Sequence, residues 1–240
     1  MNCHKDDLGT CCEKCDYNPI VLIATHERKE ITTKNIQLLK RQTRVPKIVL
    51  VVSNIDEIEY YKSLAVTVIH HVNLPLGAKW QAGVNAVAKM NPNPLIIVGS
   101  DDILIYNYVD MVLDKMKEGY DFIGTDAWYT FNVESGKLYD NKYINRNENR
   151  PIGSGKAMSL KFLNDIRWKV FDATKAKGLD DRSYMQAQNI RAKSFIIKTP
   201  EILAVKGRWA TLNPTEKYLT SPNINVRKAN MDILKHFGYV

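Results

Sequence analysis

Short apolar runs alternate with amphipathic stretches through the first half of the chain. Five runs have the length of strands that are covered on both faces, at residues 20–25, 47–54, 65–71, 94–99 and 121–126. Apolar residues at helical spacing predict helices between them, over 29–43, 77–90 and 108–119. This alternation predicts an α/β fold with a mostly parallel central sheet and helices on both of its faces.

The pattern changes after residue 126. Aromatic and then polar residues over 127–154 predict a hairpin followed by a loop. Helical spacing returns at 155–166 and 178–192, and residues 194–207 are strand-like. We therefore expect a nucleotide-binding half over 19–126 and a substrate-binding half over 127–240 of one continuous domain, preceded by a tail at 1–18.

The 240 residues, 45% of them hydrophobic, are enough to build one large core. A net charge of +8 suits anionic partners, namely nucleotides, phospholipid surfaces and nucleic acid, without choosing among them. No apolar run approaches the roughly 20 residues that a membrane helix needs. Residues 1–19 lack the apolar segment of a secretory signal. We therefore expect a soluble, cytoplasmic protein without a transmembrane segment.

All cysteines fall near the N-terminus, at Cys3, Cys11, Cys12 and Cys15. Cys12 and Cys15 have the C-x-x-C spacing that binds one zinc ion, and Cys3 or His4 with Cys11 can complete four ligands. Two interpretations stay open, a knuckle around a structural Zn²⁺ and a tail of free thiols. Both place these residues outside the active site.

The fourth apolar run ends directly in Ser100, Asp101 and Asp102. Adjacent like charges repel, and they are costly to desolvate unless a cation is present. In parallel sheets, ligands bind beyond the carboxyl ends of the strands. Carboxylate oxygens are the ligands that Mg²⁺ and Mn²⁺ prefer. The pair therefore predicts a metal site, and the alternative is a solvated acidic turn.

A second acidic pair, Asp180 and Asp181, opens the helix predicted over 178–192. An acid at a helix start can cap it and complement its dipole, worth about 0.5–2 kcal/mol. One acid is enough for that, which leaves the other free to act as a general base. Capping and catalysis are both open interpretations of this pair.

Four segments, taken in order, resemble the GT-A glycosyltransferases, in particular the inverting family 2 group. They are "PIVLIATHERKE", "LPLGAKWQAGVNAVAK", "LIIVGSDDILIYNYVD" and "GLDDRSYMQAQ". In that family they correspond to the first strand with its nucleotide-binding turn, a Gly-Lys…Asn-x-Gly segment, the D-x-D-type motif and a Glu-Asp helix start. The resemblance covers residues 19–215. It departs from the family at Gly99, where the first acid of D-x-D usually stands, and at Gln81, which stands at the Asn position.

The resemblance implies transfer of a sugar from a nucleotide-sugar donor, with a UDP-sugar favoured, to an acceptor hydroxyl by metal-assisted inverting displacement. It implies a nucleotide-sugar-binding half and an acceptor-binding half. The acceptor is a saccharide or glycan, with a hydroxylated DNA base as the alternative. The implied site consists of donor-binding Thr25, Glu27, Arg28, Asn54, Lys79, Gln81 and Asp101, of Mn²⁺ or Mg²⁺ ligands Asp102 and Asp101, and of the base Asp181 beside Asp180.

Two other functions compete with this one. A nucleotidyltransferase shares the half-Rossmann plan and the acidic metal site, but it carries a Gly-rich loop after the first strand, and "THERKE" has no glycine. A non-enzymatic module that binds a nucleotide or nucleic acid would use the cysteines as a zinc knuckle. That module explains residues 1–15 but gives neither acidic pair a role.

Overall fold

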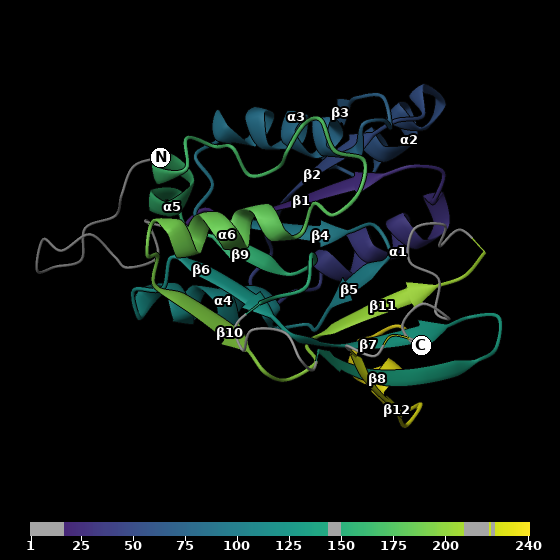
Figure 1. The fold of residues 1–240 in the computed structure, drawn as a ribbon. Helices are drawn as coiled ribbons and strands as arrows, with labels where there is room; N and C mark the ends of the chain where they lie inside the picture. Colours follow the sequence, from purple (N-terminus) through teal and green to yellow (C-terminus); the bar gives the residue numbers. More distant parts are fainter. Residues whose placement is uncertain (1–16, 144–149, 209–220, 222–223) are drawn as a thin grey trace, which may run out of the picture.

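The computed structural model describes residues 17–143, 150–208, 221 and 224–240, which form two sheets and the helices around them (Figure 1). The first sheet has the strand order β10-β6-β9-β4-β1-β2-β3. Its strands are β1 (Ile20–Thr25), β2 (Lys47–Val52), β3 (Thr67–His70), β4 (Leu95–Gly99), β6 (Phe122–Thr125), β9 (Lys156–Met158) and β10 (Ser194–Ile197). β1 runs parallel to β2 and β4, β2 to β3, and β10 to β6, whereas β9 is antiparallel to both neighbours. The predicted mostly parallel central sheet is confirmed.

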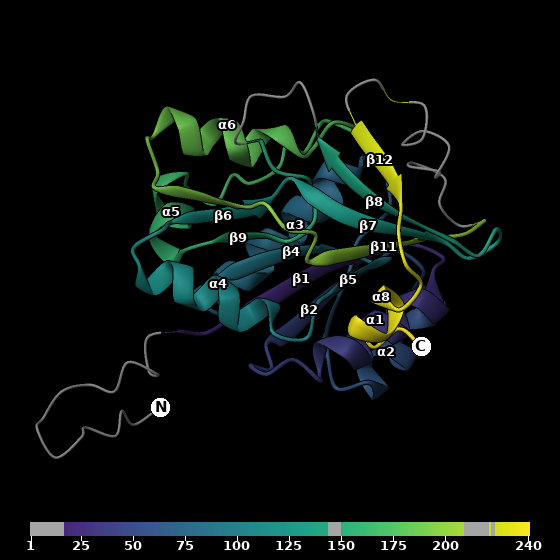
Figure 2. The ribbon, with the colours of Figure 1, turned by 90° about the horizontal axis from the view of Figure 1, so that it is seen from below.

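The apolar runs are buried because helices cover both faces of this sheet (Figure 2). Successive side chains of a strand point to opposite faces, so Ile20 and Leu22 pack in one core cluster while Val21 and Ile23 pack in the other. The helices over the first face are α3 (Leu76–Ala88), α5 (Leu160–Asp165) and α6 (Asp181–Asn189), and those over the second are α1 (Lys29–Leu39) and α4 (Tyr108–Lys117). This arrangement explains why those strands carry no alternating polar residues.

Helix α3 packs closely against the sheet at Gly83, which has no side chain. A Cβ atom at Gly83 would lie 2.7 Å from Cγ2 of Val51 and 2.8 Å from Cδ1 of Leu22. Close packing of α3 fixes the position of Lys79, one helical turn before Gly83, above the first strands.

The second sheet has the order β12-β8-β7-β11-β5 and lies beside the first (Figure 2). Its strands are β5 (Asp102–Leu104), β7 (Ala127–Asn132), β8 (Lys137–Tyr143), β11 (Ile202–Lys206) and β12 (Ile224–Lys228). β7 and β8 form the antiparallel hairpin that the sequence predicts. β5 follows β4 after a two-residue turn and pairs with β11, so the acidic turn lies where the two sheets meet.

The predicted helix over 155–166 is wrong in its first part. Residues Lys156–Met158 form β9, which fits between β4 and β6, and α5 begins only after Ser159. The Ser159 side chain accepts a 3.0 Å hydrogen bond from the Phe162 backbone N–H, which caps α5. The strand-like stretch 194–207 is two strands, one in each sheet.

The pattern also left out short elements, namely a 3₁₀ turn at Ile55–Glu57, α2 (Ile58–Ser63) and α8 (Ile233–His236). Across the described ranges, none of the helices has both the length and the apolar character to cross a membrane. The division into halves at residue 126 stays a prediction. β9 comes from the second half and completes the sheet of the first.

Candidate functional site

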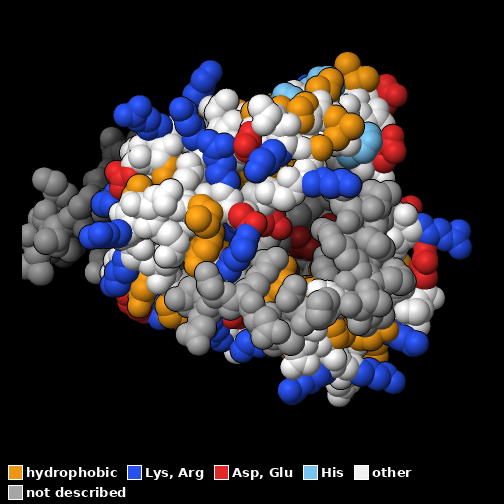
Figure 3. All heavy atoms as spheres, viewed as in Figure 1, with side chains coloured by type: hydrophobic (Ala, Val, Ile, Leu, Met, Phe, Trp, Pro, Cys, Tyr) orange, Lys and Arg blue, Asp and Glu red, His pale blue; other side chains and the backbone are white. Residues whose placement is uncertain are grey.

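The carboxyl ends of β1, β2, β3 and β4 meet at one edge of the first sheet because these four strands are parallel. The turn after β1 and the turn after β4 lie side by side there, since Arg28 contacts Ser100 and Asp101. Figure 3 shows acidic side chains in a hollow near the centre of one face, with Lys and Arg side chains around it. The sheet therefore brings the predicted residues Arg28 and Asp101 together.

The acidic turn is held by its backbone. Nδ2 of Asn35, on α1, donates to the carbonyl of Gly99 at 3.1 Å and to that of Asp102 at 2.9 Å. The backbone N–H of Val205, on β11, donates to the carbonyl of Asp101 at 2.8 Å. The side chains of Asp101 and Asp102 are only 7% and 16% exposed. The alternative of a solvated acidic turn is therefore wrong.

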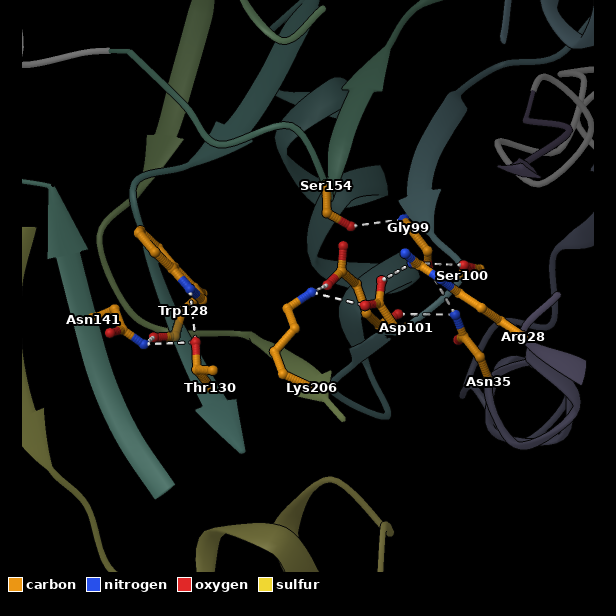
Figure 4. Close-up of polar contacts among 11 residues, drawn as sticks. Arg28, Asn35, Gly99, Ser100, Asp101, Trp128, Thr130, Asn141, Ser154 and Lys206 are labelled. Carbon is orange, nitrogen blue, oxygen red and sulfur yellow. Dashed lines mark hydrogen bonds and ion pairs between the residues drawn. The ribbon is translucent and has the colours of Figure 1, made fainter. Parts of the chain in front are cut away.

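Asp101 lies between two cations (Figure 4). Its Oδ1 is 3.3 Å from Nη1 of Arg28, and its Oδ2 accepts a 2.9 Å hydrogen bond from Nζ of Lys206. Burial acts to raise the pKa of Asp101, but the charges of Lys206 and Arg28 outweigh it and hold the pKa below its usual value. Asp101 is therefore an ionised carboxylate with both oxygens engaged.

Asp102 shares the same lysine, with Oδ1 3.8 Å from Nζ of Lys206. Burial raises the pKa of Asp102 above its usual value, the charge of Lys206 opposes that rise, and the charge of Asp101 adds to it. Its carboxylate also faces Gly99, where a Cβ atom would lie 2.2 Å from Asp102 Oδ2. The absence of a side chain at Gly99 is thus what leaves room for the Asp102 carboxylate.

Lys206 is a site residue for which the sequence predicted no contact with the acidic turn. Residues paired across two strands point to the same face, and β5 pairs Asp102 with Ala204, two residues before Lys206 on β11. Lys206 is 6% exposed. The signal in the sequence was a lysine at the end of an otherwise apolar strand, but its partners lie about a hundred residues away along the chain.

Two adjacent residues, Gly153 and Ser154, lie between the second acidic pair and the first. Oγ of Ser154 accepts a 3.1 Å hydrogen bond from the Gly99 backbone N–H and also bonds the Asp102 side chain. At the preceding residue, Gly153, a Cβ atom would lie 2.2 Å from Oδ1 of Asp180. The segment Gly153–Ser154 thus separates the carboxylates of Asp102 and Asp180.

The two acids of this second pair have different surroundings. Asp181 binds Arg150 through both of its oxygens, with Nε of Arg150 donating to Oδ1 at 2.7 Å. Asp180 is exposed, makes no capping hydrogen bond to α6, and its carboxylate has no partner within the described part of the chain. Its backbone carbonyl accepts a hydrogen bond from Nζ of the buried Lys156. Helix capping therefore does not account for the pair.

Lys79 is buried beneath the turn that follows β1. It is 1% exposed, and its Nζ donates to the Thr25 carbonyl and, at 3.2 Å, to Oδ1 of Asn73. Burial and the nearby charge of Arg28 lower the pKa of Lys79 to about 7, against the opposing charge of Glu57. Lys79 is therefore a buried lysine and not part of a solvated surface.

The other predicted donor-binding residues have contacts within the fold. Gln81 donates to the Trp168 carbonyl at 2.7 Å and to Asn85, and it accepts from the Phe171 N–H at 2.9 Å. Thr25 Oγ1 bonds Thr32 Oγ1 at 2.8 Å, and Asn54 accepts from the Asp56 N–H at 3.1 Å. Glu27 is exposed beside His26. These contacts leave the donor-binding roles of Gln81, Thr25, Asn54 and Glu27 as predictions.

The candidate zinc ligands Cys3, Cys11, Cys12 and Cys15 lie outside the described residues. Within the described ranges, no group of three or more His, Cys, Asp or Glu side chains is placed to hold a metal ion. At the acidic turn, an ion bridging both carboxylates would need the space that the Lys206 ammonium fills. The arrangement does not fit Mn²⁺ or Mg²⁺ held by Asp101 and Asp102 together.

No protein-family model matches the sequence, and no curated protein matches it. Among solved structures, the chain is similar to S. aureus TarS, with 13% identity and a TM-score of 0.53 over 78% of this chain. The match spans only 36% of the length of the TarS chain. A197 from STIV matches with 12% identity and a TM-score of 0.44, over 75% of this chain and 82% of that one. The likeness to TarS shows the fold alone, which is GT-A-like.

Proposed function

We propose that this chain is a glycosyltransferase that moves a sugar from a nucleotide-sugar donor to an acceptor hydroxyl. The observation that carries the proposal is the position of the two acidic pairs. Asp101 and Asp102 follow β4, and Asp180 precedes α6. Asp102 and Asp180 both adjoin the segment Gly153–Ser154, and Asp101 is the neighbour of Asp102. In α/β sheets with this topology, ligands bind at the carboxyl edge, where these carboxylates are.

The fold supports the same class of reaction, because TarS, whose fold this chain shares, is a glycosyltransferase. We place the diphosphate of the donor against Arg28, with the buried ammonium of Lys79 beneath the same turn. Arg28 follows β1, and only its Nη1 is bonded to Ser100 and Asp101, so Nε and Nη2 have no partner in the described structure. A guanidinium binds phosphate oxygens through such paired N–H groups. A UDP-sugar is the donor that the sequence resemblance favours.

The reaction that we propose is a single displacement. The acceptor oxygen attacks the anomeric carbon, the bond from that carbon to the diphosphate breaks, and the acceptor proton passes to a carboxylate. Asp180 suits this role better than Asp181, because Arg150 already engages both oxygens of Asp181. The attack from the face opposite the diphosphate inverts the anomeric centre.

The acceptor that we propose is a saccharide or glycan. A hydroxylated DNA base is the alternative, and the net charge of +8 supports binding to either nucleic acid or another anionic partner. If the acceptor is DNA, binding to a DNA duplex will weaken steeply as salt is raised, because counterions are released from the phosphates. That Mn²⁺ or Mg²⁺ assists the reaction stays a prediction from the sequence alone.

The test is release of nucleoside diphosphate from UDP-, GDP- and TDP-sugars, with water or a panel of saccharides as acceptor and with either Mn²⁺ or EDTA present. We expect turnover of one donor class. Asp180→Asn should lower the rate by about 10²–10⁴-fold, the contribution of a general base. Asp114→Asn is the matched control, because that acid is exposed on α4 and paired only locally with Lys117.

Two outcomes would contradict the proposal. If no donor binds or turns over, the chain is not a glycosyltransferase. If Asp180→Asn keeps full activity and Asp181→Asn loses it, the general base is Asp181 and not Asp180. The class of reaction would be unchanged.

A further inference from the structure

We propose that Lys206 takes the place of a divalent cation at the acidic turn, so that the chain binds its nucleotide-sugar donor without a metal ion. This inference rests on the proposed function and names the charge that faces the donor. The sequence suggested a metal because two adjacent acids need a cation. The structure supplies that cation from β11.

The first support is where the ammonium lies. Its Nζ is 2.9 Å from Oδ2 of Asp101 and 3.8 Å from Oδ1 of Asp102, so it is close to both carboxylates. Figure 4 shows the Lys206 side chain reaching from its strand toward Asp101. The whole stem is enclosed, since the side chain is 8% exposed. A metal ion shared by the two acids would first have to displace this buried lysine.

The second support is that the backbone fixes this geometry. β5 and β11 are paired in antiparallel register from Ile202↔Leu104 to Ala204↔Asp102, and the Val205 N–H continues the contact to the Asp101 carbonyl. Lys206 therefore reaches the acids from a strand that is bonded to the acidic turn itself. Such an ammonium is a permanent part of the site rather than a surface side chain that happens to lie near it.

The third support is the balance of charge. Lys206 and Arg28 match the two carboxylates of Asp101 and Asp102 one for one, and Lys79 adds a further positive charge when it is protonated. Buried charges persist in proteins when they are paired in this way. The charges of the two carboxylates are therefore balanced by the three basic side chains without a metal ion. The excess positive charge suits an anionic diphosphate.

The fourth support is the absence of a further ligand. The family places an acid where this chain has Gly99, and a side chain there would collide with Asp102 at 2.2 Å from its Oδ2. Within the described ranges, no third His, Cys, Asp or Glu completes a metal cluster at the turn. Hard divalent cations need several oxygen ligands, and the oxygens of Asp101 are already bonded to cations of the protein.

The first experiment measures UDP, GDP and TDP binding to the full chain by calorimetry, in EDTA and in Mn²⁺. We expect the dissociation constant of the nucleotide that binds to agree within about threefold between the two conditions, a difference below about 1 kcal/mol. Lys206→Met should weaken that binding by about tenfold or more in EDTA, as expected for loss of a charged hydrogen-bond donor. Lys137→Met is the control, because Lys137 is exposed on β8.

The second experiment measures Mn²⁺ binding alone by electron paramagnetic resonance. Wild type should leave Mn²⁺ free, whereas Lys206→Ala should gain an Mn²⁺ site, because it uncovers two adjacent carboxylates. Loss of that site in Lys206→Ala/Asp102→Asn would place it at the acidic turn. Circular dichroism confirms that the variants fold, and the wild-type measurements decide the question if they do not.

The inference is overturned if nucleotide binding to wild type requires Mn²⁺, or if wild type binds Mn²⁺ and loses it in Asp102→Asn. It is also overturned if Lys206→Met binds nucleotide as tightly as wild type does. Should no nucleotide bind in either condition, the proposed function fails. The Mn²⁺ measurement on wild type then still decides whether the lysine or a metal ion occupies the turn.

Discussion

Lys79 is expected to make the stability of this protein depend on pH, and its replacement by methionine removes that dependence. The amine is 1% exposed, and burial, with the charge of Arg28, lowers its pKa to about 7. In the unfolded chain the pKa returns to its usual value of 10.5. Between these two values the unfolded state binds more protons than the folded state, so folding becomes more favourable as the pH rises.

The size of the effect follows from the two pKa values. Each pKa unit corresponds to about 1.36 kcal/mol, so a shift from 10.5 to about 7 destabilises the protonated folded state by about 5 kcal/mol. Below about pH 7 this penalty is fully present, and it disappears by about pH 10.5. A neutral methionine of similar length carries no such penalty. Lys79→Met should therefore be more stable than wild type at about pH 6. The gain in unfolding free energy is the avoided penalty of about 5 kcal/mol minus the contribution of the two lost hydrogen bonds, about 1 kcal/mol each.

Urea unfolding from about pH 6 to pH 9.5 measures this directly. The advantage of Lys79→Met over wild type should shrink by about 3 kcal/mol between pH 7 and pH 9.5. Lys89→Met is the control, since Lys89 is exposed just after the same helix and should show no such slope. A constant difference between Lys79→Met and wild type across this range would refute a buried lysine with a lowered pKa.

Three further predictions concern the same edge of the sheet. Because the charge of Lys79 lies beneath the turn where we place the diphosphate, affinity for a UDP-sugar should fall as the pH rises from about 6 to 9, since the ammonium loses its proton above about pH 7. Lys79→Met should flatten this profile in calorimetric titrations. Gly155→Ala should lower the free energy of unfolding by about 1–3 kcal/mol more than Gly136→Ala does. Both glycines have positive φ, but only at Gly155 would a Cβ atom collide, because it would lie 2.4 Å from Cδ1 of Ile202. Equal losses of stability in urea unfolding would contradict this packing. Gly99→Ala should lower nucleotide affinity by displacing the Asp102 carboxylate, and unchanged affinity would show that this carboxylate does not shape the site.

The strands β1, β2, β4 and β6 could be predicted because each is a continuous apolar run that two layers of helices cover. Their order in the sequence also predicted that Asp101 would lie at a carboxyl edge. Both inferences need only local periodicity and the rules of parallel sheets.

β9 and β5 could not be predicted, because three residues carry too little periodicity to identify a strand. Pairing with strands distant in the sequence makes them strands, at Lys156–Met158 and Asp102–Leu104. The same pairing brings Lys206 to the acidic turn. A contact between Lys206 and Asp101 depends on the register of two strands and is invisible in either segment alone, so the sequence suggested a metal where the structure holds a lysine.

The measurement that most directly tests the central claim is a thermal-shift titration of the full chain with UDP, GDP, CMP, TDP and UDP-sugars, each with Mn²⁺, Mg²⁺ or EDTA. A ligand that binds only the folded state stabilises it by about 2.7 kcal/mol at a hundred times its dissociation constant. We predict a concentration-dependent shift with one nucleotide class, lost in Arg28→Met. No shift with any nucleotide under any of the three conditions would contradict a donor site at this edge of the sheet.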